Sequence, residues 1–209
     1  ETDVTLKLTR EAAKVDGATG EESFVRWGLG QNLFGNSFTA PIKISSITMP
    51  DDLEKTVYIY NTGSGKDWSA TLSNSDATGA GTYTAIPINM AERLDMNEIP
   101  SMQGFLLKYT KEKTVYSTTP TEVKLSYSGN VMTTASLPQR AKAYEMENNQ
   151  PTGFVKLVLL GEKAGDQMWL CESENATEGF DNGWDGSKLG GEMMPTAIYS
   201  TTKDGICLL

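Results

Sequence analysis

The sequence predicts an all-β protein, an antiparallel β-sandwich or jelly roll with long loops, and three observations support this class. Apolar and polar residues alternate with a period of two in many short runs, as expected for strands with one buried face. Clusters rich in Gly, Asn, Asp, Ser and Thr separate the runs, for example at 61–67 and 73–81. Only one stretch, 89–95, indicates a helical turn, with Asn89 as its cap and Glu92 in the following turn.

The alternation places expected strands along the whole chain. The apolar residues that share one strand face are Val4, Leu6 and Leu8 in the first run, Val57 and Ile59 in a second, and Val123, Leu125 and Tyr127 in a third. Further strands are expected at 42–48, 83–88, 104–109, 154–160, 167–172 and 205–209. Because no helices alternate with these strands, we expect a single β-sandwich domain over residues 1–209; the alternative is a minor subdivision near the Thr/Pro stretch 117–121.

The stretch N-L-F-G-N carries a local turn prediction. Leu33 and Phe34 are expected to anchor a strand, while Gly35 and Asn36 supply a turn with positive φ. The stretch therefore indicates fold specification rather than ligand contact.

Charge and composition exclude several classes of function. The chain of 209 residues has a formal charge of −9 and no histidine. An acidic surface repels phosphate backbones, so we expect no nucleic-acid partner. Histidine-dependent catalysis and histidine metal sites are impossible. Glu172, Glu174, Glu178 and Asp181 supply carboxylates for a glycosidase pair, but none has the apolar flanks of a proton-retaining acid. We therefore expect a solvated acidic face and no enzyme activity, and no run is long enough for a membrane span.

Two cysteines, Cys171 and Cys207, lie late in the chain, each in a strand-like run. They form either one disulfide between neighbouring strands or two buried thiols, and the sequence supports both alternatives equally. Two cysteines without histidine do not make a zinc site.

The stretch 180–192, F-D-N-G-W-D-G-S-K-L-G-G-E, resembles a calcium-binding loop. Asp181, Asp185 and Glu192 fall at the spacing of calcium ligands, although Gly183 offers no side-chain oxygen where the pattern has one. Ca²⁺ is therefore the one candidate cofactor. The favoured alternative is a glycine-rich polar loop whose aspartates accept hydrogen bonds from the loop's own amides.

Trp184 lies in the same stretch and has no apolar neighbours. An exposed indole of this kind is a typical platform for a sugar ring, with Asp181, Asn182 and Asp185 bonding its hydroxyls. The alternative is that Trp184 folds back as a lid over a small satellite core.

Other aromatic residues are weaker candidates. Trp68 is a second ligand-binding candidate, although a position in the core is favoured. Trp27 and Trp169 have apolar neighbours and are expected in the core. Tyrosines in strand-like runs, such as Tyr58 and Tyr60, either line a glycan groove or cap the rim of the core.

A series of short phrases resembles secreted and cell-surface proteins of the Bacteroidetes. G-Q-N-L-F-G-N-S-F-T-A-P-I-K-I at 30–44 is similar to the "NLIGNPFPSPI" phrase of those proteins, and T-V-Y-I-Y-N and G-F-L-L-K are similar to their "vYiYN" and "GFFVK" phrases. Later, F-D-N-G-W-D-G-S-K is similar to "fDngyDa.K", and a strand like G-I-C-L-L commonly closes the module. The order of phrases covers roughly 27–209, and Ser37 replaces the usual proline.

The resemblance implies a β-sandwich accessory or adhesion-type module outside the cell, without an assigned activity. We therefore expect a non-catalytic extracellular carbohydrate-binding module that binds a polysaccharide or surface glycan. The alternative is a structural or adhesive cell-surface domain that contacts protein and has no sugar site. The start of the chain lacks a signal-peptide pattern, so we expect a mature form or a segment of a larger secreted protein.

Overall fold

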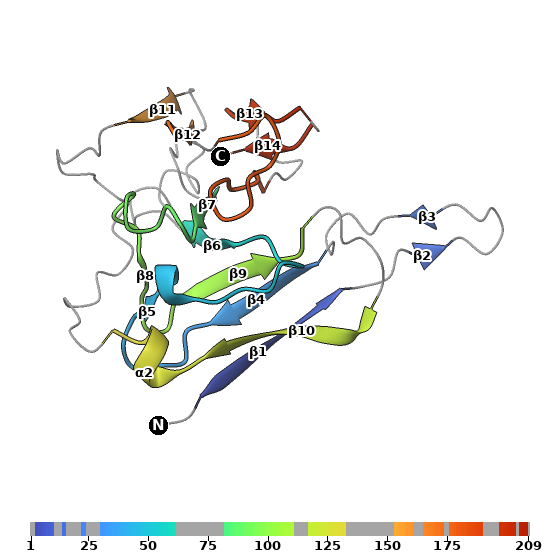
Figure 1. Ribbon diagram of the computed structural model, residues 1–209, viewed down its shortest axis with the longest axis vertical. Coiled ribbons are helices and arrows are strands. Elements are labelled where there is room, and N and C mark those ends of the chain that lie inside the picture. Colours follow the sequence, from blue (N-terminus) through green and yellow to red (C-terminus); the bar gives the residue numbers. More distant parts are fainter. Residues whose placement is uncertain are drawn as a thin grey trace, which may run out of the picture.

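The computed structural model describes residues 3–10, 14–15, 22–23, 30–61, 82–110, 117–132, 153–160, 165–173, 176–189, 197–203 and 205–208 (Figure 1). Its strands are β1 (Val4–Arg10), β2 (Lys14–Val15), β3 (Glu22–Ser23), β4 (Gln31–Gly35), β5 (Ile42–Lys43), β6 (Thr56–Asn61), β7 (Thr82–Pro87), β8 (Glu98–Ile99), β9 (Gly104–Lys108), β10 (Ser117–Leu125), β11 (Phe154–Leu160), β12 (Gly165–Cys171), β13 (Ser200–Thr201) and β14 (Cys207–Leu208). The helical elements are short: η1 (Ile44–Ser46), a 3₁₀ turn, and α2 (Tyr127–Asn130). The all-β prediction is confirmed, while the finer sandwich or jelly-roll connectivity and the single domain stay predictions.

The largest sheet has the strand order β4-β9-β6-β7 and is antiparallel throughout. Strand β6 lies inside this sheet and is buried on both faces. Val57 and Ile59 point into the main core, as the alternation predicts, and Tyr58 between them is fully buried on the opposite face. Tyr58 is therefore not a rim residue, because a second layer of the protein covers its side of the sheet.

Strands β1 and β10 form an antiparallel pair, in which Leu6 lies opposite Val123. Leu6, Leu8 and Val123 are buried, which confirms the alternation predicted for these runs. The Asn32 side chain joins β4 to β1, since its Oδ1 accepts from the Thr9 amide at 3.0 Å and its Nδ2 donates to the Thr9 carbonyl at 3.0 Å. The Thr/Pro stretch 117–121 lies within β10.

The main core collects apolar residues from most of the chain. It consists of Leu6, Leu8, Ile42, Ile44, Ile47, Met49, Leu53, Val57, Ile59, Ile86, Met90, Ala91, Leu94, Met96, Ile99, Phe105, Leu107, Tyr109, Val123 and Leu125. Three of these, Met90, Ala91 and Leu94, come from the predicted turn at 89–95, which forms a single helical turn in which the Leu94 amide donates to the Met90 carbonyl at 2.9 Å. Trp169 packs against this core, as predicted, while Trp27 lies outside the described residues.

Several local predictions are wrong. The expected strand 42–48 ends at Lys43, because Ile44–Ser46 form η1, and Tyr127 begins α2 rather than continuing β10. Leu33 and Phe34 lie in a strand, as predicted, and Phe34 packs on the core, but Leu33 is 72% exposed because it lies on the outward face of the edge strand β4.

Asn36 is the clearest correction of the turn prediction. It is buried and has no positive φ; instead its Nδ2 donates to the Ile99 carbonyl at 2.8 Å, and its Oδ1 accepts from the Phe38 amide at 2.9 Å. The positive φ in this region belongs to Gly30, where an added Cβ would lie 2.8 Å from the Tyr109 ring. The asparagine therefore joins two loops rather than making the turn.

The remaining strands form pairs: β11 with β12, β13 with β14, β2 with β3, and β5 with β8. Cys171 and Cys207, which end β12 and begin β14, are both half-buried free thiols, so the disulfide alternative is not realised. Within the described ranges, no helix is long and apolar enough to cross a bilayer.

Candidate functional site

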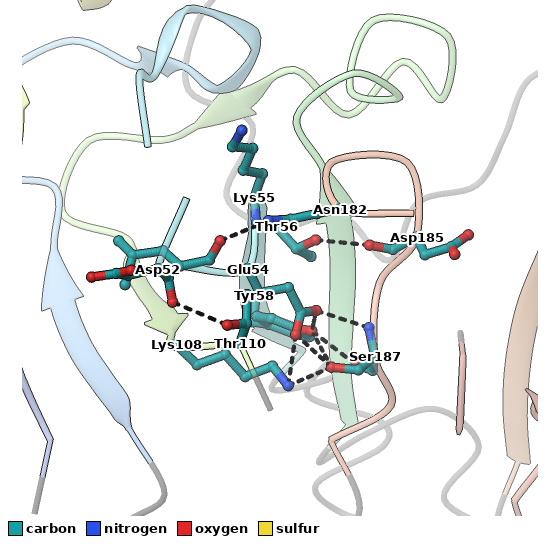
Figure 2. Close-up of polar contacts among 11 residues, drawn as sticks. Asp52, Glu54, Lys55, Thr56, Tyr58, Lys108, Thr110, Asn182, Asp185 and Ser187 are labelled. Atoms are coloured by element: carbon teal, nitrogen blue, oxygen red, sulfur yellow. Dashed lines mark hydrogen bonds and ion pairs between the residues drawn. The ribbon is translucent and has the colours of Figure 1, made fainter. Parts of the chain in front are cut away.

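Residues 181–188 lie along the four-stranded sheet and are fastened to it by hydrogen bonds (Figure 2). Asn182 provides the first anchor. Its Oδ1 accepts from the Lys55 amide at 2.7 Å and its Nδ2 donates to the Leu53 carbonyl at 3.0 Å. Both hydrogen-bonding groups of this amide are therefore used by the backbone that leads into β6.

Further anchors fix the glycine-rich turn. The Asn89 amide donates to the Gly183 carbonyl at 3.1 Å, and the Thr56 hydroxyl donates to the Asp185 carbonyl at 3.1 Å. Gly183 has a φ of 94°, which favours glycine. Gly186 lies so close to β7 that an added Cβ would stand 2.7 Å from the Ala85 Cβ. The glycines of this stretch thus permit close approach of the 181–188 segment to the sheet.

Substitution of Gly186 tests this close approach. We expect Gly186→Ala to lower the free energy of unfolding by about 1–3 kcal/mol, because the new methyl group overpacks against Ala85 and the segment must move. Gly35→Ala is the matched control, since a Cβ added there would have nothing within 4 Å. Urea denaturation measures both variants. Equal midpoints for the two would contradict the close packing.

The main polar feature beneath the segment is a buried network of Glu54, Tyr58, Lys108 and Ser187 (Figure 2). Lys108 Nζ lies 2.8 Å from Glu54 Oε2, and the Ser187 hydroxyl donates to the same oxygen at 2.7 Å. The Ser187 amide donates to Glu54 Oε1 at 2.9 Å, and the Tyr58 hydroxyl donates to that oxygen as well. Lys108 also contacts the Ser187 hydroxyl. Every group in this network has a partner, as a buried polar group requires.

Burial and the charge of Glu54 raise the pKa of Tyr58 well above its ordinary value. The phenol is therefore neutral and acts as a donor to the carboxylate. The Glu54 side chain is 3% exposed and that of Lys108 is 16% exposed, so the ion pair is largely desolvated. The network links residues that are up to 133 positions apart in the chain.

Local sequence patterns do not reveal this network. Glu54, Lys108 and Ser187 stand in three separate stretches, and nothing local connects them. Lys108 does follow the apolar run G-F-L-L-K directly. A lysine at that place is ordinarily expected to point to solvent, so its position does not predict a buried ion pair.

A second buried pair joins the segment to β12. The side chains of Lys188 and Asp166 form an ion pair and are 6% and 4% exposed. Asp166 Oδ2 also accepts from the Ile198 amide at 2.7 Å. Ser187 and Lys188 therefore tie consecutive backbone positions to two different parts of the fold.

The carboxylates predicted to bind a ligand take part in hydrogen bonds within their own loop. The Thr177 amide and hydroxyl donate to the two oxygens of Asp181, each at 2.8 Å, and the Asp181 amide donates to Asp185 Oδ2 at 2.8 Å. These are the contacts that the polar-loop alternative predicts. Glu192 lies outside the described residues, and the part of the chain that is described contains no group of three or more metal-ligating side chains. The calcium site stays a prediction.

Trp184 is 46% exposed and does not fold back as a closed lid. It borders an open depression of about 240 Å³. The depression is lined by Met90, Cys171, Ser173, Ala176, Asp181, Asn182, Trp184 and Asp185. The four residues predicted to form a ligand site thus share one surface depression, while Trp68 lies outside the described residues.

The surroundings of Asp185 favour the neutral form of its carboxyl. Burial first, and then the charges of Asp181 and Glu54, raise the pKa of the Asp185 carboxyl above its ordinary 3.8, against the hydrogen bond from the Asp181 amide. A carboxyl with a raised folded-state pKa favours folding below its unfolded pKa and loses that contribution as pH rises through the folded value.

Asp185→Asn tests this assignment through the pH dependence of stability. Asparagine keeps an acceptor for the Asp181 amide but carries no charge. We expect the variant to gain stability relative to the native chain as pH rises from about 3.8, and the gain to level off above the raised pKa. Thermal melts from pH 3 to 8 measure the difference. A constant difference across this range would contradict the raised pKa.

Comparison with known proteins finds a partial relative. The chain is 32% identical over 168 residues to the minor fimbrium subunit Mfa5 of Porphyromonas gingivalis. The matched region covers 77% of this chain but only 13% of that protein, so the chain spans about an eighth of the relative's length. No family model matches the chain, and no solved structure matches it. The homology supports the resemblance to cell-surface proteins of the Bacteroidetes, without testing the individual phrases.

Proposed function

We propose that the chain is a structural or adhesive domain of a bacterial cell-surface protein and that it contacts protein partners. The observation that carries the proposal is the similarity over 77% of the chain to a segment of a minor fimbrium subunit. This favours the second of the two functions expected from the sequence over a dedicated carbohydrate-binding module. Because the chain corresponds to 13% of that relative, we place it as one part of a larger protein outside the cell or on its surface.

The described contacts support a non-catalytic role. Among the residues that the structure describes, Ser187 beside Lys108 resembles a nucleophile with a base. Ser187, however, is buried and donates its hydroxyl proton to Glu54, and Lys108 is ion-paired to the same carboxylate. A hydroxyl held in this way is not free to attack a substrate, so the network serves the fold.

Immunogold electron microscopy of intact source cells tests the proposed location. Antibodies raised against the 209-residue chain should label the cell surface or filaments on it, and a strain lacking the gene serves as control. Labelling confined to permeabilised cells would overturn the proposal. Adhesion is tested separately, with beads coated with the chain and offered immobilised proteins from the bacterial surface and from host matrix.

Carbohydrate binding is the second candidate, and one observation favours it: Trp184 is 46% exposed beside a depression. Affinity electrophoresis against plant and host polysaccharides tests it. Retardation that Trp184→Ala abolishes and Met102→Ala leaves intact would favour a sugar site, because Met102 is an accessible apolar residue at 85% exposure that does not line the depression. Melting with and without chelator tests calcium in the same samples, since an ion bound only to the native form raises the midpoint.

A further inference from the structure

The depression beside Trp184 carries negative charge. Asp181 and Asp185 contribute two carboxylates to its lining, and no lysine or arginine belongs to the lining within the described residues. The amide of Asn182 is already used on both sides, by the Lys55 amide and the Leu53 carbonyl. One of the two N–H donors of its NH₂ group is therefore used by the Leu53 carbonyl.

Three cationic side chains of this part of the fold interact with groups other than Asp181 and Asp185. Lys55 pairs with Asp51 at 2.7 Å, and Lys203 pairs with Glu178 at 3.1 Å. The guanidinium of Arg93 stacks over the Phe154 ring, 4.9 Å from its centroid, and its Nη1 donates at 3.6 Å to the Sγ of Cys171 at the border of the depression. After burial, the charge of Asp181 also raises the pKa of the Asp185 carboxyl, although the hydrogen bond from the Asp181 amide acts against it; an added cation would reduce this repulsion.

Trp184 adds a second, independent feature. A half-exposed indole attracts an ammonium or guanidinium group to its face, and tryptophan is the best of the aromatic side chains for this contact. The depression, at about 240 Å³, lies below the roughly 300–1,000 Å³ of sites for drug-sized ligands, so a small group is the better fit.

We propose that this depression receives the Lys or Arg side chain of a partner protein, held between the Trp184 indole and the carboxylates of Asp181 and Asp185. The inference rests on the proposed function, because it names the chemistry by which the domain contacts protein. A sugar hydroxyl both donates and accepts, whereas ammonium and guanidinium groups only donate. A lining with two carboxylates and, within the described residues, no lysine or arginine attracts a cation by its charge, which it does not do for a neutral sugar.

Titration of the ¹⁵N-labelled 209-residue chain with short peptides tests the proposal. The probes are acetyl-Gly-Gly-Lys-Gly-Gly-amide, the same peptide with arginine, and the same peptide with N-ε-acetyllysine, which lacks the charge. We expect the charged peptides to shift the Trp184 indole resonance and the amides of 181–185, and the acetylated peptide to shift neither. Binding should weaken as salt is added.

Two variants and a matched control locate the site. Asp185→Asn and Trp184→Ala should each weaken binding of the lysine peptide about fivefold. Glu178→Gln removes the same charge from the neighbouring exposed Glu178–Lys203 pair, which does not line the depression, and should change binding less than about twofold. Amide spectra of each variant show directly whether its fold is retained.

Three results would overturn the inference. In the first, the charged peptides shift no resonance of 181–185. In the second, Glu178→Gln weakens binding as much as Asp185→Asn does, and in the third, an oligosaccharide shifts these resonances while the charged peptides do not. The last result would assign the depression to a glycan. A failure here leaves the proposed function testable, because surface labelling and protein adhesion do not depend on this depression.

Discussion

Glu54→Gln is expected to lower the free energy of unfolding by about 3–5 kcal/mol, measured by urea denaturation. Glutamine has nearly the shape of glutamate and still accepts from Tyr58 and from the Ser187 amide. It removes the charge that compensates Lys108, whose ammonium lies 2.8 Å from Glu54 Oε2 and is 16% exposed. The loss therefore measures the removal of the counter-charge and of the acceptor at Oε2, to which Lys108 and the Ser187 hydroxyl donate, rather than a changed shape.

The control for Glu54→Gln is Glu122→Gln, which breaks the exposed pair with Lys7 and should cost about 0–1 kcal/mol. A second variant, Glu54→Gln with Lys108→Met, should recover much of the lost stability, because both charges are then absent. If Glu54→Gln costs no more than Glu122→Gln, Lys108 escapes to solvent and the network does not hold the segment.

The elements that could be predicted are those whose signal is local. The faces of β1, β6 and β10 follow from alternation, since neighbouring side chains of a strand point to opposite sides. The single turn at 89–95 follows from its own residues. Each of these predictions depends on a short run of consecutive residues, and each is confirmed except at Tyr127, which begins α2.

Three of the wrong predictions concern position within the whole fold. Leu33 is exposed because β4 is an edge strand, and Tyr58 is buried because residues 181–189 cover the outer face of β6. Alternation gives the face of a residue but not the layer that covers it. Asn36 is typical of a turn in sequence, yet its side chain reaches Ile99, across a separation that local pattern does not include.

The residues that meet at the candidate site could be predicted from the sequence, but the contacts that hold them against the sheet could not. Trp184, Asp181, Asn182 and Asp185 do share one depression, because they are close in sequence. That Asn182 and Ser187 are anchored to residues 127 to 133 positions away follows from the tertiary fold alone. The glycine-rich composition that resembled a calcium loop accompanies close packing against β7, where Gly186 approaches Ala85.

Asp166→Asn is expected to have an effect of similar size, about 3–5 kcal/mol, because it leaves the Lys188 ammonium buried at 6% exposure without a counter-charge. Asparagine still provides an acceptor for the Ile198 amide, so the change again isolates the charge. The control is Glu178→Gln at the exposed pair with Lys203, at about 0–1 kcal/mol. Asp166→Leu combined with Lys188→Met should return stability toward that of the native chain, and a double variant as weak as Asp166→Asn would contradict the assignment.

The two large effects should also be coupled. Glu54 holds Ser187 and Asp166 holds Lys188, and these are consecutive residues of one segment. Once either anchor is lost and the segment moves away from the sheet, the other anchor is already weakened. The variant with both Glu54→Gln and Asp166→Asn should therefore lose less stability than the sum of the two single losses, with a coupling of about 0.5–3 kcal/mol. Strict additivity would mean that Ser187 and Lys188 are released independently. Hydrogen exchange at their two amides distinguishes these outcomes, because the amides of a segment that opens as one unit share one free energy of opening.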